Sequence, residues 1–157
     1  MSIANAESRN ASSQPFAQIG YDFMAACFEV HRELGGGLLE EIYQESLEIE
    51  LILRKVEFVS KQDLTMFYKG HQLRKRYVPD LVVAGHVVVE LKAVNCITPE
   101  HEAQLFNYMR ITRQPVGYLV NFAPIQKVEW KRFVISKHLK AEENRPIIAE
   151  VILTHSH

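Results

Sequence analysis

Apolar side chains recur at helical spacing in the first third of the chain. Between residues 16 and 34 they fall at every third or fourth position, which predicts an amphipathic helix. Gly35-Gly36-Gly37 ends this helix, because a run of glycines permits a sharp reversal of the chain. A second helix follows, with its apolar stripe at Leu39, Ile42, Tyr43, Leu47 and Leu51 and a polar face opposite at Glu41, Gln44, Glu45 and Glu48.

The pattern changes to the alternation of strands after residue 55. Short β-type segments are predicted at 56–60, 64–68, 73–78, 81–83 and 86–92. Pro99 begins a further helix that continues to about residue 113, because proline suits the first helical turn. An almost wholly apolar segment at 116–122 predicts a strand buried on both faces, and 127–135 predicts a last strand. We therefore expect an α/β fold, a mixed sheet flanked by helices, with its early strands in a meander.

Length and composition indicate one globular domain. The 157 residues are 47% hydrophobic and 24% charged, which argues against a disordered chain or a coiled coil. We expect a disordered tail at 1–14, a folded domain at 15–140 and a C-terminal extension at 141–157. Apolar runs are too short to span a bilayer, and residues 1–5 lack the basic segment and apolar core expected of a secretory signal. Two cysteines make neither a disulfide framework nor a zinc quartet, so we expect a cytoplasmic protein without a membrane partner.

Charge is unevenly distributed although the net charge is only −1. Residues 61–140 carry 13 Lys and Arg against 6 Asp and Glu, whereas residues 1–60 carry 4 against 10. A basic middle segment can supply the positive field that a nucleic-acid backbone attracts. The alternative is that the two halves of the chain neutralise each other across the fold.

Three charged side chains stand where the predicted strands are most apolar. Glu90 and Lys92 alternate with Leu91, so they project from the same face of their strand. Asp80 precedes the neighbouring strand, and Gly85 provides a tight turn between the two strands. The three charges should therefore converge in a hydrophobic neighbourhood, where ions need a partner or a function.

Two interpretations of this cluster remain open from the spacing alone. Two carboxylates on adjacent strands are hard oxygen ligands that suit Mg²⁺ or Mn²⁺, and a lysine beside them can act on a metal-bound water or a phosphate. The other interpretation is an ion-pair cluster of Asp80, Glu90 and Lys92 at the sheet edge without a metal.

The same residues carry a resemblance to a known family. Pro79-Asp80, followed ten residues later by Glu90-Leu91-Lys92, resembles the PD-(D/E)XK phosphodiesterase superfamily. Gly37-Leu38-Leu39-Glu40-Glu41-Ile42-Tyr43 resembles the name motif of one branch, the GxxExxY family of small prokaryotic proteins. Further landmarks in the expected order are Val30 to Gly35, His101, Gln104, Asn107-Tyr108 and Val120 to Phe122, so that the resemblance covers about residues 16–135.

The resemblance implies a restriction-endonuclease-like core, in the order helix, three antiparallel strands, helix and strand. It implies Mg²⁺ bound by Asp80 and Glu90, with the backbone carbonyl of Leu91 as a further ligand. Lys92 would act on the attacking water, and Glu40 would complete the site from the second helix. Glu40 also has an explanation without catalysis, because a carboxylate in a first helical turn is stabilised by the helix dipole.

Other polar residues near the motif are candidates for holding the substrate. Gln104 and Tyr108 are four residues apart on one helix face and resemble an extra motif of RecB-type nuclease domains, although a solvated helix edge has the same pattern. Phosphate contacts are expected from Arg74, Lys75 and Arg76, just before the Asp80 strand.

The sequence therefore predicts a metal-dependent nuclease that hydrolyses phosphodiester bonds in DNA or RNA. The alternative is a non-catalytic module that binds nucleic acid or protein and is built on the nuclease fold. The small size of the chain favours a partner in either case, as a homo-oligomer or in a larger assembly.

Overall fold

The computed structural model describes residues 16–143, so the predicted tail at 1–14 and residues 144–157 of the predicted extension lie outside the described residues. Two helices come first, α2 (Ala17–Leu34) and α3 (Glu40–Leu53), where the apolar spacing predicts them. Within the described part of the chain, no helix is long and apolar enough to cross a membrane.

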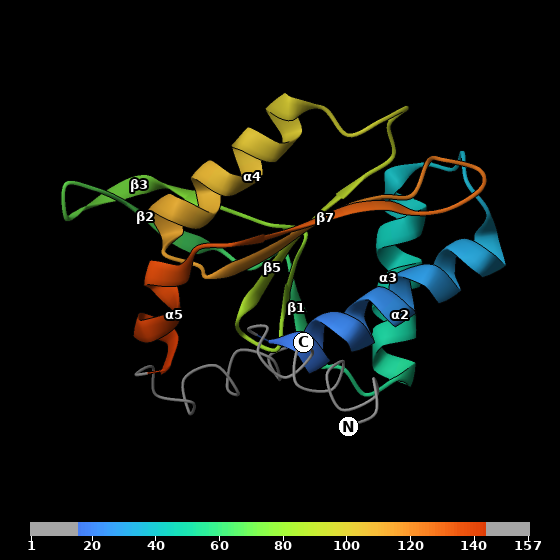
Figure 1. Ribbon diagram of the computed structural model, residues 1–157, viewed down its shortest axis with the longest axis horizontal. Coiled ribbons are helices and arrows are strands. Elements are labelled where there is room, and N and C mark those ends of the chain that lie inside the picture. The colour runs from blue at the N-terminus through green and yellow to red at the C-terminus, as the bar shows by residue number, and fades with distance from the viewer. Residues whose placement is uncertain (1–15, 144–157) are drawn as a thin grey trace, which may run out of the picture.

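A five-stranded mixed sheet forms the centre of the molecule (Figure 1). The strand order is β1-β4-β5-β6-β7, and only β5 and β6 are parallel neighbours. Helix α4 (Pro99–Thr112) makes the crossover between these two strands. From α3 to β6 the sheet and its helices follow the predicted order of helix, three antiparallel strands, helix and strand, which confirms the expected fold class. The strands are β1 (Phe58–Ser60), β4 (Leu81–Val83), β5 (Val87–Lys92), β6 (Val116–Asn121) and β7 (Glu129–Val134).

The predicted meander is wrong, because two of its strands leave the main sheet. Strands β2 (Leu64–Tyr68) and β3 (His71–Tyr77) pair only with each other. They form the β2–β3 hairpin, which lies between β1 and β4 in the sequence but outside the main sheet. Every residue of β3 before Tyr77 is exposed. The strand therefore has no apolar face that could pack under a helix, as the strands of the main sheet do. The hairpin projects away from α2 and α3 and lies alongside α4 (Figure 1).

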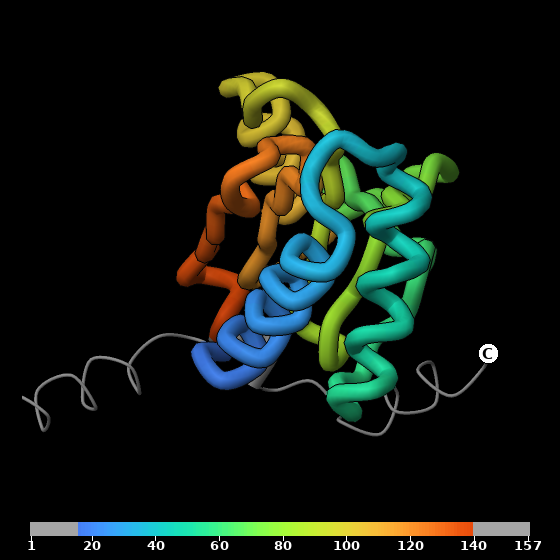
Figure 2. Tube along the Cα trace, turned by 90° about the vertical axis from the view of Figure 1, so that its right-hand side faces the viewer, coloured from blue at the N-terminus to red at the C-terminus, as the bar shows by residue number. Residues whose placement is uncertain are grey.

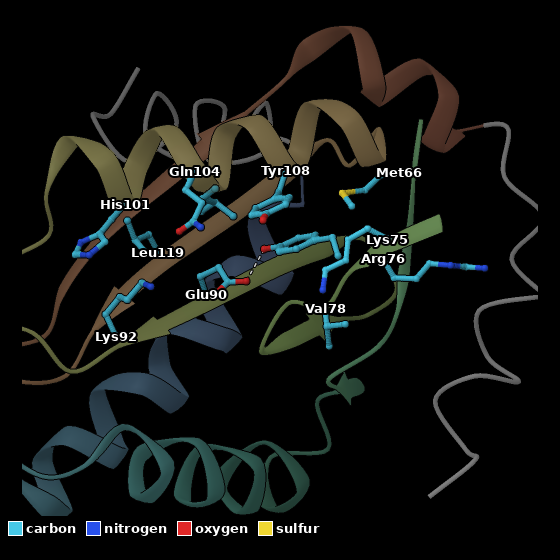
Figure 3. Close-up of a pocket in the computed structure, with 12 residues that line it drawn as sticks. Met66, Lys75, Arg76, Val78, Glu90, Lys92, His101, Gln104, Tyr108 and Leu119 are labelled. Carbon is cyan, nitrogen blue, oxygen red and sulfur yellow. Dashed lines mark hydrogen bonds between the residues drawn. The ribbon is translucent and has the colours of Figure 1, made fainter. Parts of the chain in front are cut away.

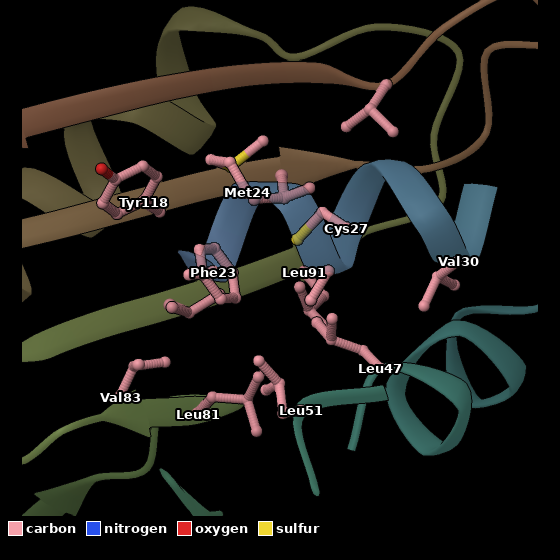
Figure 4. Packing of buried hydrophobic residues seen from close by; sticks show 14 of the residues in the cluster. Phe23, Met24, Cys27, Val30, Leu47, Leu51, Leu81, Val83, Leu91 and Tyr118 are labelled. Atoms are coloured by element: carbon pink, nitrogen blue, oxygen red, sulfur yellow. The ribbon is translucent and has the colours of Figure 1, made fainter. Parts of the chain in front are cut away.

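Helices cover both faces of the main sheet and bury two apolar layers. Helices α2 and α3 contact each other and lie together in front of the sheet in Figure 2. Between them and the sheet lies the larger layer, shown in Figure 4, in which Phe23, Leu47, Leu51, Leu81 and Leu91 are almost fully buried. The smaller layer joins α4 to the other face through Leu105, Met109, Val88 and Leu119. The Asp80–Lys92 region is thus fixed between two packed layers.

The polar face predicted for α3 is only partly exposed. Gln44 donates hydrogen bonds to the Glu48 carboxylate at 3.1 Å and to the Asp80 carbonyl oxygen at 3.2 Å. The Ser60 hydroxyl at the end of β1 donates to the same Glu48 carboxylate. Leu39, predicted on the apolar stripe, is instead 68% exposed. Leu39 precedes the first helical residue, whereas Tyr43, Leu47 and Leu51 of the predicted stripe are fully buried, and polar groups of α3 find partners at the ends of β1 and β4.

One short helix was not predicted from the pattern. Helix α5 (Ser136–Glu143) follows β7, and the domain end expected at residue 140 falls inside it. Ile135, the residue before this helix, donates its N–H to the carbonyl oxygen of Pro115, the residue before β6, at 2.8 Å.

Candidate active site

The strand pair β4–β5 brings Asp80, Glu90 and Lys92 to one end of the sheet. The register pairs Leu81 with Val89, so Asp80 lies opposite the end of β5. The Leu91 N–H donates to Asp80 Oδ2 at 2.7 Å, which fixes the carboxylate against the strand. Glu90 and Lys92 project from the same strand face into a pocket (Figure 3). The three side chains therefore meet as the spacing predicts.

Asp80 is buried and has a partner that the sequence did not indicate. Its side chain is only 9% exposed, and its Oδ1 forms an ion pair with the Lys61 ammonium group. Partial burial opposes the charged form of Lys61, but the hydrogen bond and charge of Asp80 outweigh it and hold the pKa of Lys61 above its ordinary value. Lys61 lies 19 residues before Asp80, a separation at which no local pattern shows the pairing.

Glu90 is held by a tyrosine in a largely buried environment. The Tyr77 hydroxyl donates to Glu90 Oε1 at 2.5 Å. Burial, together with the negative charge of Asp80, raises the pKa of Glu90 to about 7, although the Tyr77 hydrogen bond and the charge of Lys92 act in the opposite direction. Burial also raises the pKa of Tyr77, so its hydroxyl stays protonated and remains a donor.

Glu40, the first residue of α3, lies within the field of the same cluster. Partial burial raises the pKa of its carboxyl group, and the negative charge of Asp80 adds to this effect. The positive charges of Lys92 and Lys61 act in the opposite direction. The structure therefore brings Glu40 to the candidate site, as the resemblance implies.

Tyr43 fixes the turn from which Glu40 projects. Its hydroxyl donates to the Gly35 carbonyl oxygen at 2.6 Å and accepts the Leu38 N–H at 3.1 Å. Its ring is fully buried and stacks on Phe122, with the ring centroids 4.8 Å apart. Tyr43 therefore joins the start of α3 to the end of β6, beside the candidate site.

The loop that follows β6 is locked against the glycine turn. The buried His31 ring shares a hydrogen bond of 2.7 Å with the Pro124 carbonyl oxygen. Gly36 packs so closely that an added Cβ would lie 2.6 Å from the same oxygen. Asn121, completely buried, accepts the Val94 N–H at 3.0 Å and donates to the Val94 carbonyl oxygen at 2.8 Å. These motif residues thus hold the chain on both sides of the candidate site rather than contribute reactive groups.

A pocket of about 380 Å³ lies between β5, α4 and the β2–β3 hairpin (Figure 3). His101, Gln104 and Tyr108 face it from α4, as their shared helix face predicts. His101 also caps this helix, because its Nδ1 accepts the Thr98 N–H at 3.1 Å. The pocket is lined by Met66, Lys75, Arg76, Tyr77, Val78, Glu90, Lys92, His101, Gln104, Leu105, Tyr108 and Leu119.

Tyr108 is connected to Glu90 through a second ring. Its ring stacks on Tyr77, with centroids 4.1 Å apart and planes 3° from parallel. Because the Tyr77 hydroxyl binds Glu90, the position of Tyr108 is coupled to that of the carboxylate through two contacts.

The basic residues predicted for phosphate contact lie on β3 of the β2–β3 hairpin. Arg74, Lys75 and Arg76 are all exposed, and the last two also line the pocket. Figure 3 shows Lys75 and Arg76 at the opposite end of the pocket from Lys92. Arg76 donates to the Thr65 hydroxyl at 2.9 Å, which aligns its side chain across the hairpin.

The donor atoms at this end of the sheet fit a hard divalent cation. Among residues 16–143, no three His, Cys, Asp or Glu side chains are grouped so that they could hold a metal ion. Two carboxylates, Asp80 and Glu90, are available, and the Leu91 carbonyl should face the same side as its N–H, which points at Asp80. A small number of protein ligands is sufficient for Mg²⁺, because this ion keeps several of its bound waters. Burial disfavours the ionised form of Glu90, and a bound cation would offset this cost by stabilising the negative charge.

Comparison with known proteins agrees with this geometry. A sequence model of the PD-(D/E)XK nuclease superfamily matches residues 17–133. The chain therefore belongs to this superfamily, whose members generally use divalent metal ions and act on nucleic acid, and its fold is restriction-endonuclease-like. No curated protein matches the chain.

Two solved structures are similar in outline. The crystal structure of SSO0001 has 17% sequence identity and a TM-score of 0.47, and the match covers 74% of this chain and 59% of that one. An alkaline exonuclease (LHK-Exo) from Laribacter hongkongensis has 15% identity and a TM-score of 0.45, over 89% of this chain and 80% of the exonuclease. The chain thus spans less than two thirds of the SSO0001 protein.

Proposed function

We propose that this protein is a nuclease of the GxxExxY branch that uses Mg²⁺ or Mn²⁺ to hydrolyse phosphodiester bonds in DNA or RNA. The observation that carries the proposal is that β4 and β5 bring Asp80 next to Glu90 and Lys92, two residues that line a pocket beside a basic hairpin. Glu40 and Tyr43 support the branch, since one faces the cluster and the other fixes the turn before it. The catalytic domain would span residues 15–140, acting alone, as a homo-oligomer or within a larger assembly.

The carboxylates would hold the metal. Asp80, Glu90 and the Leu91 carbonyl are the proposed ligands. Glu40 would complete the site from α3 only by moving closer, because among residues 16–143 no three such side chains are grouped to hold a metal ion. The bound ion would act as a Lewis acid on a phosphate oxygen and lower the pKa of an attacking water. Tyr77 would keep Glu90 oriented by its hydrogen bond while the ligand set forms.

Lys92 would assist the hydrolysis itself. In this reaction the oxygen of water forms a bond to phosphorus, the bond to the leaving sugar oxygen breaks, and that oxygen receives a proton. Lys92 shares the strand face and the pocket with Glu90, so its ammonium can orient the water or offset the negative charge that grows on the phosphate. A pure binding module needs no lysine beside two buried carboxylates.

The substrate would lie along the pocket and the β2–β3 hairpin. Arg74, Lys75 and Arg76 would bind backbone phosphates, which gives affinity without base specificity. Gln104 and Tyr108 would position the strand near the cluster from α4.

A cleavage assay tests the proposal directly. Labelled single-stranded DNA, duplex DNA and RNA are incubated with the protein in Mg²⁺, in Mn²⁺ and in EDTA. We expect cleavage of at least one substrate that EDTA stops. Asp80→Asn, purified in the same way, is the control for contaminating nucleases, and it should be inactive. If wild type cleaves nothing, or cleaves no faster than Asp80→Asn, the nuclease proposal is wrong and a binding module takes its place.

A further inference from the structure

Lys61 is anchored by its backbone next to the candidate site, between β1 and the β2–β3 hairpin. Its N–H donates to the Asp80 carbonyl oxygen at 3.2 Å, and Gln44 donates to the same oxygen at 3.2 Å. The side chain of Lys61 is nevertheless 56% exposed. The ammonium group can therefore change its position while the backbone stays where it is.

The Lys61 ammonium occupies an oxygen that a metal ion could bind. Asp80 Oδ2 accepts the Leu91 N–H at 2.7 Å, and in the structure the Lys61 ammonium binds Oδ1. A cation that binds Oδ1 therefore competes directly with Lys61. Two cations repel each other strongly at the distance of a shared ligand atom, more so where burial lowers the local dielectric constant. Repulsion from a metal ion bound to Asp80 therefore favours release of Lys61.

A charge count shows where Lys61 would go. Three carboxylates, on Asp80, Glu90 and Glu40, face two ammonium groups, on Lys61 and Lys92, which gives −1 when all are ionised. A divalent cation changes this balance to +1. An anion then offsets the surplus, and the anion that a nuclease site receives is a backbone phosphate.

We propose that Lys61 is a positioning residue that couples metal binding to substrate binding, a role that rests on the nuclease function proposed above. Without metal, its ammonium neutralises Asp80 and keeps the ligand carboxylate in place. When a divalent cation binds Asp80, Lys61 releases Oδ1 and pairs with a phosphate of the nucleic acid. The residue thus competes with the metal and assists the substrate.

Mn²⁺ binding without nucleic acid tests the first half of this role. Electron paramagnetic resonance measures free Mn²⁺ in titrations of wild type, Lys61→Met and Lys61→Arg. Removing the competing cation should lower the Kd of Lys61→Met for Mn²⁺ by about two- to fivefold, the scale of one partly exposed ion pair. Lys61→Arg keeps the charge and should bind like wild type. Thermal unfolding in EDTA should show a lower Tm for Lys61→Met, because Asp80 loses its partner.

Lys137→Met is the matched control. Lys137 is exposed in α5, two residues after Ile135, which is hydrogen-bonded to Pro115 just before the start of β6. The candidate site lies at the other end of β6, where Lys92 of β5 is the register partner of Asn121. Loss of the Lys137 charge should leave Mn²⁺ affinity unchanged.

Binding of single-stranded DNA tests the second half. Fluorescence anisotropy is measured in EDTA and in saturating Ca²⁺. Ca²⁺ should strengthen DNA binding by wild type about three- to tenfold more than by Lys61→Met, since only wild type gains a released ammonium for the phosphate. The variant should therefore bind metal more tightly and DNA in Ca²⁺ more weakly. A merely structural lysine would weaken both, and that result overturns the proposal.

The outcomes separate this proposal from the nuclease function. If wild type binds Mn²⁺ and cleaves, but Lys61→Met binds Mn²⁺ no more tightly, only the role of Lys61 is wrong. An equal Ca²⁺ effect on DNA binding in wild type and Lys61→Met has the same consequence. If wild type binds no Mn²⁺ at all, both proposals are wrong.

Discussion

In the metal-free protein, the fold favours the protonated form of Glu90. Burial raises its pKa from 4.5 to about 7, and the charge of Asp80 acts in the same direction. Between these two pH values, the folded protein keeps a proton that the unfolded chain has released. The free energy of unfolding should therefore fall as the pH rises through this window. Glu90→Gln removes the titration but keeps an oxygen that accepts the Tyr77 hydroxyl, so in this variant the fall should be missing.

The size of the effect follows from the shift in pKa. A shift of one pKa unit corresponds to about 1.4 kcal/mol, so the rise of Glu90 from 4.5 to about 7 corresponds to at most about 3 kcal/mol. Glu90 retains some contact with solvent, which makes this an upper bound. Near pH 4 the variant and wild type should be equally stable, and near pH 8 Glu90→Gln should be more stable by about 1–3 kcal/mol.

Urea unfolding in EDTA, repeated from pH 4 to pH 8, measures this difference. Other titrating groups are common to both proteins and cancel in the subtraction. Glu45→Gln, an exposed change on α3, is the control and should follow wild type at every pH. If the pH profile of Glu90→Gln has the slope of wild type, the proposed environment of Glu90 is incorrect. Mn²⁺ at pH 8 should increase the free energy of unfolding of wild type more than that of Glu90→Gln, because the variant has lost a ligand carboxylate.

Three further predictions concern binding, turnover and the fold. Changing Arg74, Lys75 and Arg76 together to Gln should weaken the salt dependence of binding to single-stranded DNA. In fluorescence anisotropy titrations, the slope of log affinity against log salt concentration should become smaller by about 2. An unchanged slope would mean that the phosphates bind elsewhere. Lys92→Met should slow single-turnover cleavage by about 10²–10⁴ with little change in affinity, and a wild-type rate would remove Lys92 from the mechanism. Tyr43→Phe should lower the free energy of unfolding by about 1–2 kcal/mol in urea, since two backbone groups lose their partner; no loss would mean that water replaces the hydroxyl.

Local patterns were sufficient for most elements and for the cluster itself. Helical spacing, the glycine turn and the Gly85 reversal depend on neighbouring residues, so they predicted α2, α3 and the β4–β5 pair. The alternation of Glu90 and Lys92 placed both on one strand face for the same reason. The resemblance to the superfamily indicated a role for Glu40, which stands three residues before Tyr43 at the edge of the buried stripe, whereas Glu41 lies outside that stripe.

The errors concern contacts between distant segments. Strand β3 has strand-like residues, but whether it joins the main sheet depends on an apolar face that it lacks. Gln44 was placed on the solvated side of α3, because its partner is a backbone carbonyl 36 residues away. The ion pair between Lys61 and Asp80 was missed for the same reason, since it depends on how the loop after β1 crosses the start of β4.

The location of a bound metal ion tests the central claim most directly. Crystals of the protein grown with Mn²⁺ at pH 8 and measured at the manganese absorption edge would show the ion by its anomalous scattering. The account predicts one strong peak at a coordination distance of about 2.1–2.3 Å from carboxylate oxygens of both Asp80 and Glu90. A peak bound to other residues, or no peak at a Mn²⁺ concentration that supports cleavage, would contradict it.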